Sequence, residues 1–318
     1  MLTQIKDKAS LVARLAFTHQ GRVSLFLNPE GQVRGGWKAL LFLLAYGIVS
    51  NVLVIPVVVA GLALKMELRP LVEYKFGPLL GVLAGLAVTA AFLAIERKPF
   101  RTVGFHMNAR WARELALGTL GGILIMIVTA LALLAMGGFH WVRNPNGSLW
   151  GIVMGSLIFL AVAINEETVF RGYPFQRLVA GLGTWPTQIL LAGLFALVHW
   201  GNPGIQDAPP ALKAWTTLNI ALAAVLLGLC YLKTQSLALP IGVHLGWNWA
   251  QGNLLGFQVS GTTQAQGLWM PVLHARPEWL TGGPVGLEGS VVCAGLVGVV
   301  IIGLVVWKPN GRHRVEID

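Results

Sequence analysis

The fold is decided by the stretch Asn165-Glu166-Glu167-Thr168-Val169-Phe170-Arg171, which ends an apolar run that opens near Leu149. The run has the composition of a membrane span, yet it carries two adjacent carboxylates and an arginine. Because a charged side chain in a bilayer costs a few kcal/mol or more, ionisable residues at such depth are functional candidates by default. The alternative is that these charges end the helix at the membrane surface, with the arginine extended towards water.

Helical geometry separates the two glutamates. Glu167 and Arg171 are i,i+4 partners on one face of a helix. Glu166 lies about 100° around the helix from Glu167, since an α-helix has about 3.6 residues per turn. Glu167 therefore has a counter-ion within its own helix, whereas Glu166 is free to face another group.

The composition indicates an integral membrane protein. Of 318 residues, 55% are hydrophobic and 11% are charged, whereas soluble domains carry about 25% charged residues. The net charge of +10 comes from basic residues beside apolar runs, which favours positive-inside topology over a nucleic-acid partner. Cys230 and Cys293 lie within apolar runs and predict neither a disulfide framework nor a thiolate metal site. No cleavable signal peptide is expected in residues 1–35.

We expect an all-α polytopic membrane protein with about eight spans, each near the ~20 residues that cross a bilayer. The spans are placed at about 38–64, 77–95, 115–137, 149–172, 185–201, 215–233, 236–257 and 288–307. The predicted inner segments hold most of the 23 Lys and Arg residues, which places both termini inside. Close helix packing in lipid is expected at the glycines of two spans, namely Gly118, Gly121, Gly122, Gly295, Gly298 and Gly303.

Two further polar clusters stand in apolar surroundings. His199 lies near the end of one predicted span, and His244 and Asn248 share one face of a later span at i,i+4 spacing. A lone histidine on an apolar helix is more often a hydrogen-bonded core residue than a catalytic one. However, Glu166 and these three residues lie about 12–21 Å from the predicted inner ends of their helices, at about 1.5 Å per residue. Scattered structural polar residues would have no reason to share this depth.

Such a set of residues suits peptide hydrolysis, which requires a base for water and donors for the oxyanion. A partly desolvated glutamate is a stronger base than a solvated one. Glu166 and His199 could activate water, while His244 and Asn248 could donate to the oxyanion. Alternatively, Glu166, His199 and His244 form a set suited to Zn²⁺ with an open fourth position.

Three motifs carry a resemblance to a known family. Glu166-Glu167-x-x-x-Arg171, Phe195-x-x-x-His199 and His244-x-x-x-Asn248 follow one another on consecutive predicted spans. They resemble the motifs of the CPBP family, which comprises CaaX-processing and bacteriocin-processing intramembrane endopeptidases, including the type II CaaX prenyl protease. The resemblance covers roughly residues 149–257. The stretch Arg101-Thr-Val-Gly-Phe followed by Trp111 is similar to one often seen ahead of that core.

The resemblance implies an intramembrane endopeptidase that acts, in the lipid bilayer, on a peptide or a membrane-anchored protein, either membrane-associated or of prenylated type. By motif position, Glu166 would activate water together with His199, and His244 and Asn248 would stabilise the oxyanion. Glu167 and Arg171 would support the site as a pair. We expect a glutamate protease without a metal cofactor, with zinc as the alternative. The expected location is the plasma membrane, or the inner membrane if the protein is bacterial.

The chain divides into four predicted segments. Residues 1–37 form a cytoplasmic segment that is amphipathic or loosely ordered, and residues 38–148 hold the first three spans. Residues 149–257 are the catalytic core, and residues 258–318 comprise an outer loop, the last helix and a basic tail.

Two other classes of function compete with the protease. A non-catalytic scaffold or bacteriocin-immunity-type protein could use the same fold, although every motif position is filled here. A transporter would also place Glu, Arg and His at mid-depth, but here the polar residues all lie in the second half of the chain. Other intramembrane proteases fit poorly, because Gly155-Ser156 is not followed by glycine and no Gly-x-Gly-Asp motif occurs.

Overall fold

The computed structural model describes residues 25–28, 31–68, 72, 76–262 and 267–306. The basic tail after residue 306 and most of the predicted amphipathic segment lie outside the described residues. The helices are α2 (Gly35–Ala63), α3 (Gly77–Ile95), α4 (Ala109–Ala135), α5 (Leu149–Glu167), α6 (Tyr173–Leu182), α7 (Thr184–Val198), α8 (Pro203–Gln206), α9 (Pro210–Thr234), α10 (Ala238–Trp249), α11 (Glu278–Thr281) and α12 (Val291–Val306).

The structure confirms an all-α polytopic membrane protein. Among the described residues, five helices are long and apolar enough to cross a membrane. They are Gly35–Ala63, Gly77–Ile95, Ala109–Ala135, Leu149–Leu182 and Pro210–Thr234. Val291–Val306 is a shorter apolar helix. The count of eight spans and the orientation of the termini stay predictions.

Several element boundaries differ from those predicted. The fourth span continues past residue 172 to Leu182, because a π turn at Thr168–Gly172 joins α5 to α6 without a break. α4 begins at Ala109 instead of near residue 115, since the Asn108 side chain accepts a hydrogen bond from the Trp111 backbone N–H and caps the helix. A short antiparallel pair, β1 (Phe139–Arg143) with β2 (Trp269–Leu273), was not predicted.

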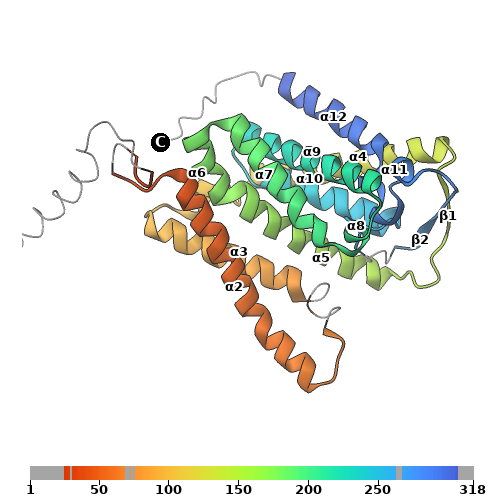
Figure 1. The fold of residues 1–318 in the computed structure, drawn as a ribbon, viewed down its shortest axis with the longest axis horizontal. Helices are drawn as coiled ribbons and strands as arrows, with labels where there is room; N and C mark the ends of the chain where they lie inside the picture. The colour runs from red at the N-terminus through yellow and green to blue at the C-terminus, as the bar shows by residue number, and fades with distance from the viewer. Residues whose placement is uncertain (1–24, 29–30, 69–71, 73–75, 263–266, 307–318) are drawn as a thin grey trace, which may run out of the picture.

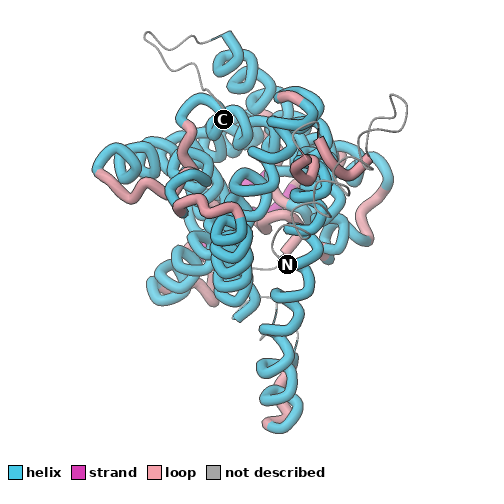
Figure 2. The backbone as a smooth tube through the Cα atoms, turned by 90° about the vertical axis from the view of Figure 1, so that its left-hand side faces the viewer, coloured by secondary structure: helices cyan, strands magenta, loops and turns pink. Residues whose placement is uncertain are grey.

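The helices form a bundle from which α2 projects (Figure 1). The first turns of α2 pack on the bundle through the buried residues Ala39 and Phe42. The rest of α2 extends away from the bundle, as the rotated view also shows (Figure 2). Many of its apolar side chains are exposed. Such an apolar exterior suits a helix in contact with lipid.

A carboxylate joins α2, α3 and α6 at one end of the bundle. Glu96, directly after α3, accepts hydrogen bonds from Lys38 Nζ (2.9 Å) and the Tyr173 hydroxyl (2.7 Å), and it pairs with Arg177. Partial burial alone would raise the pKa of Glu96, but the hydrogen bonds from Arg177, Lys38 and Tyr173 lower it to about 2. The side chain is therefore an anion that fixes the position of α2 on the bundle.

α4 and α10 approach each other so closely that their backbones touch. A Cβ added at Gly122 would lie 2.1 Å from the Val243 carbonyl oxygen, and one added at Gly246 would lie 2.0 Å from the Thr119 carbonyl oxygen. Gly118 and Gly242 are equally crowded. Small residues permit this kind of contact between helices, and here they set the height and rotation of α10 relative to α4.

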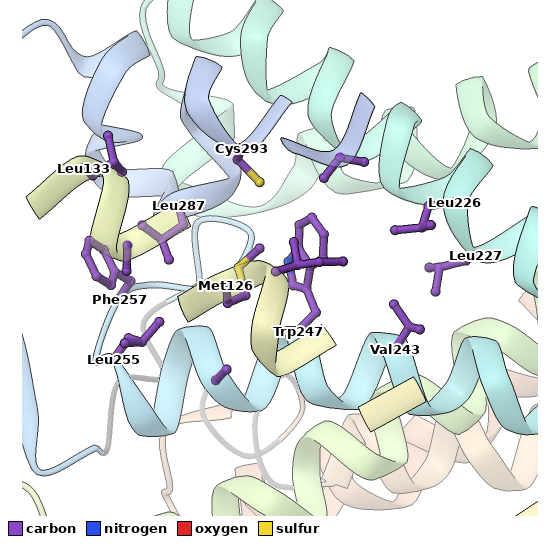
Figure 3. Packing of buried hydrophobic residues seen from close by; sticks show 14 of the residues in the cluster. Met126, Leu133, Leu226, Leu227, Val243, Trp247, Leu255, Phe257, Leu287 and Cys293 are labelled. Carbon is purple, nitrogen blue, oxygen red and sulfur yellow. The ribbon is translucent and has the colours of Figure 1, made fainter. Parts of the chain in front are cut away.

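α10 also directs Trp247 into a cluster of buried apolar residues (Figure 3). Met126 of α4, Leu226 of α9 and Cys293 of α12 belong to this cluster. The packing predicted for Gly295, Gly298 and Gly303 is wrong within this chain, since an added Cβ there would meet no atom within 4 Å. These glycines face away from the bundle, and α12 contacts it through Cys293 and Val297 instead.

We expect Gly246→Ala to lower the midpoint of thermal unfolding in detergent, because the new methyl group would push α10 away from α4. Overpacking of this kind costs about 1–3 kcal/mol. The matched control is Gly121→Ala, since Gly121 lies next to Gly122 but faces open space. Equal midpoints for the two variants would contradict the role of the α4–α10 contact.

Candidate active site

Glu167 is the centre of the hydrogen-bond network in the stretch that the sequence singled out. The side chain is 0% exposed. Its Oε1 accepts from Arg171 Nη1 at 3.1 Å and from His244 Nδ1 at 2.8 Å. Arg171 also donates from Nη2 to the Ala224 carbonyl oxygen of α9 at 3.0 Å. The predicted ion pair is confirmed, and it additionally ties α5 to α9 and α10.

Each helix that carries a candidate residue changes its hydrogen-bonding pattern beside that residue. The π turn Thr168–Gly172 follows Glu167, and a second π turn, Ala250–Leu254, follows Asn248 closely. A 3₁₀ turn begins at His199. Single π turns inside α-helices occur frequently at functional sites, so this pattern agrees with the placement of the site here.

Glu166 differs from its neighbour in environment. Its side chain is 26% exposed, and its Oε2 lies 3.8 Å from His244 Nε2. That buried oxygen has no hydrogen-bond partner among the described residues. His244 therefore faces both glutamates, with Nδ1 on Glu167 and Nε2 towards Glu166.

The aromatic residue of the second motif positions its histidine. The Phe195 ring lies against the Arg171 guanidinium (4.7 Å from carbon to ring centroid) and against the His199 ring (4.6 Å between centroids). His199 Nδ1 lies 2.7 Å from the Phe195 carbonyl oxygen. Because a carbonyl oxygen only accepts, Nδ1 carries the hydrogen, and Nε2 of the neutral ring is able to accept a proton.

Glu166, His199, His244 and Asn248 all line one pocket, which holds about 1440 Å³ of empty space including its opening. A smaller pocket adjoins it and shares His199, His244 and Asn248 among its walls. The structure thus brings the four candidate residues together, although they come from three helices separated in sequence.

Tyr46 and Glu288 are among the polar residues at these pockets that escaped the sequence analysis. Tyr46 of α2 lines the larger pocket and exchanges hydrogen bonds with Asn165, with the two oxygen atoms 3.1 Å apart. Glu288, in the turn before α12, lines the smaller pocket and is 4% exposed. Neither belongs to a recurring motif, and the only sequence signal for Glu288 is a carboxylate next to an apolar run.

The zinc alternative can be compared with the positions of its three ligands. Within the described ranges, no group of three or more His, Cys, Asp and Glu side chains is arranged to hold a metal ion. Glu166, His199 and His244 share a pocket but do not form such a group as they stand.

We expect Arg171→Ala to lower thermal stability in detergent strongly. Removing one partner of a buried ion pair leaves an uncompensated charge, which costs about 3–5 kcal/mol. Arg177 is no neutral comparison because it pairs with Glu96, so the control is Arg113→Ala at an exposed position of α4. If both variants unfolded at the same midpoint, the Glu167–Arg171 pair would not stabilise the fold.

Comparison with known proteins finds a family match over part of the chain. Residues 148–250 match the family model described as type II CAAX prenyl endopeptidase Rce1-like. The uncharacterized protein YyaK of Bacillus subtilis (strain 168) is 23% identical over 229 residues, which cover 70% of this chain and 73% of YyaK. No solved structure matches the chain. All three motifs fall inside the matched segment, and the match confirms the resemblance to CaaX-processing endopeptidases over residues 148–250.

Proposed function

We propose that the protein is an intramembrane endopeptidase that hydrolyses a peptide bond of a membrane-associated protein or peptide, with Glu166 as the base for water. The observation that carries the proposal is the environment of Glu166, which lines the larger pocket and is 26% exposed, while its buried Oε2 has no hydrogen-bond partner among the described residues. The family match over residues 148–250 supports the class of reaction.

The arrangement supports a direct attack by water. Glu166 takes a proton from a water molecule while His199 Nε2 helps to hold that molecule, and the oxygen attacks the carbonyl carbon of the peptide bond. Glu166 then passes the proton to the amide nitrogen as the carbon–nitrogen bond breaks, which leaves a carboxylic acid and an amine. A positioned general base of this kind contributes typically ~10²–10⁴ in rate.

The tetrahedral oxyanion requires donors, and His244 and Asn248 line the same pocket. Nδ1 of His244 donates to Glu167, so donation from Nε2 requires a doubly protonated ring. Carboxylates at 2.8 Å and 3.8 Å from its two nitrogens stabilise that positive charge. We therefore propose that Glu167 acts through His244 as well as through Arg171.

The pocket favours an enzyme over the competing classes of function. A scaffold or immunity protein would need no pocket lined by an unpaired carboxylate and two histidines. A transporter would need a path on both sides of the polar residues. We further propose that the substrate is a peptide or a membrane-anchored protein and that the protein resides in the plasma membrane, or the inner membrane of a bacterium.

We expect Glu166→Gln to lower the rate of cleavage by at least about 10²-fold. The midpoint of thermal unfolding should stay near that of the wild type. The amide keeps the shape of the side chain but cannot take the proton. The assay is mass spectrometry of products from a library of membrane-anchored reporter peptides in proteoliposomes. Glu167→Gln is the comparison, and it should lower the midpoint because Arg171 loses its counter-ion. Wild-type cleavage by Glu166→Gln would refute the assigned role.

We expect activity to survive thorough chelation, and elemental analysis to find less than one zinc per chain. The proposal needs Glu166 and His199 only within hydrogen-bond reach of one water, about 2.6–3.2 Å, and it gives Asn248 a task that a zinc site would not. The contrary result is one tightly held zinc per chain that is lost together with activity in His244→Ala. That result would make the protein a metalloprotease.

A further inference from the structure

We propose that Glu288, outside all three motifs and outside the family match, is a positioning residue that holds the oxyanion-binding side of the active site in place. This inference rests on the proposed peptidase function. Glu288 lies in the turn Leu287–Gly289 directly before α12. Its carboxylate lines the smaller pocket together with His199, His244 and Asn248.

The first connection runs to the helix that bears His244 and Asn248. Trp247 Nε1 donates to Glu288 Oε1 at 2.7 Å. Trp247 lies between the two candidate residues in α10, so its hydrogen bond to Glu288 anchors the helix at the point where both project. The contact with α4 sets the position of α10 as a whole, and this bond adds a polar anchor directly beside the site.

The second connection runs towards His199. The Ser260 hydroxyl donates to Glu288 Oε2 at 2.6 Å, and the Asn202 side chain donates to the Ser260 carbonyl oxygen at 2.8 Å. The Asn202 backbone N–H in turn donates to the His199 carbonyl oxygen at 3.0 Å. One carboxylate thus joins the turn that begins at His199 to the helix that carries the other two residues.

A third connection fixes the main chain on either side of the Glu288 side chain. Asn219 of α9 donates to the backbone carbonyl oxygens of Glu288 at 2.7 Å and of Ser290 at 2.8 Å. The main chain around Glu288 is therefore anchored to α9, and the side chain reaches from this anchor into the site.

The cost of burial argues against a purely structural glutamate. A buried carboxylate is tolerated only when hydrogen bonds replace its water, and an apolar residue of similar volume often serves stability equally well or better. Glu288 is also within electrostatic range of both His199 and His244. A carboxylate here therefore does what an apolar residue could not, because it orients two donors and places negative charge beside two imidazoles.

The test is a set of kinetic measurements on the full-length protein in proteoliposomes, with the reporter peptides that the wild type cleaves. We expect Glu288→Gln to lower kcat by about tenfold or more while KM changes less than about twofold, as for an interaction made in the transition state. In an Asn248→Ala background the same change should lower kcat by less than about threefold, because residues that act as one unit are not additive. The matched control, Glu278→Gln at an exposed position of the same connection, should leave kcat unchanged.

Equal losses in the two backgrounds, or wild-type kcat for Glu288→Gln, would overturn the proposal. If Glu288→Gln does not fold, Ser260→Ala removes one donor and should still lower kcat by about threefold, and wild-type kcat in that variant would overturn the proposal as well.

A measurement independent of activity separates this inference from the proposed function. Diethylpyrocarbonate modifies histidines, and mass spectrometry gives the rate for each one, with the exposed His106 as internal standard. We expect His199 and His244 to react faster in Glu288→Gln than in the wild type, since the network that encloses them is broken. If the wild type cleaves no peptide, the proposed function fails, and these rates alone decide the role of Glu288. In that case, unchanged modification rates of His199 and His244 would overturn the positioning role of Glu288.

Discussion

The rest of the structure depends on one buried negative charge. Glu167 has no contact with solvent, and a carboxylate in that position is tolerated only if protein donors replace water. The donors come from its own helix and from α10, through Arg171 and His244. α5 and α10 therefore cannot slide or rotate past each other without exposing an unsatisfied charge. The arrangement that stabilises this charge also sets His244 opposite Glu166.

The sequence predicted the part of the site that depends on local spacing. The Glu167–Arg171 pair and the shared face of His244 and Asn248 follow from the i,i+4 geometry of a helix. The hydrogen bond between His244 and Glu167 joins residues 77 positions apart. No periodicity within one helix specifies a contact between two helices, so this bond had to come from the structure. The π turn after Glu167 was also invisible, because no residue of Thr168–Gly172 distinguishes a π turn from an α-helical one.

The sequence also predicted the long helices of the fold, but it did not predict all of their boundaries. Apolar length alone located the long helices, since a bilayer requires about 20 residues per span. Boundaries failed where a cap or a π turn decided them, as at Asn108 and beyond residue 172. The glycines show the same limit. Gly122 and Gly121 are indistinguishable by composition, yet Gly122 faces the α10 backbone and Gly121 faces open space.

The contact between α4 and α10 has a consequence for what counts as a unit in this protein. The segment that matches the family begins at residue 148, whereas α4 ends at Ala135. α10 carries two of the four candidate residues, and its glycine face is complete only against a helix from outside that segment. A polypeptide excised at the boundaries of the match would expose bare backbone on α10. The segment that matches the family is therefore smaller than the segment that has to fold as a unit. A protein that uses these three motifs in this way also requires α4, which contains none of them.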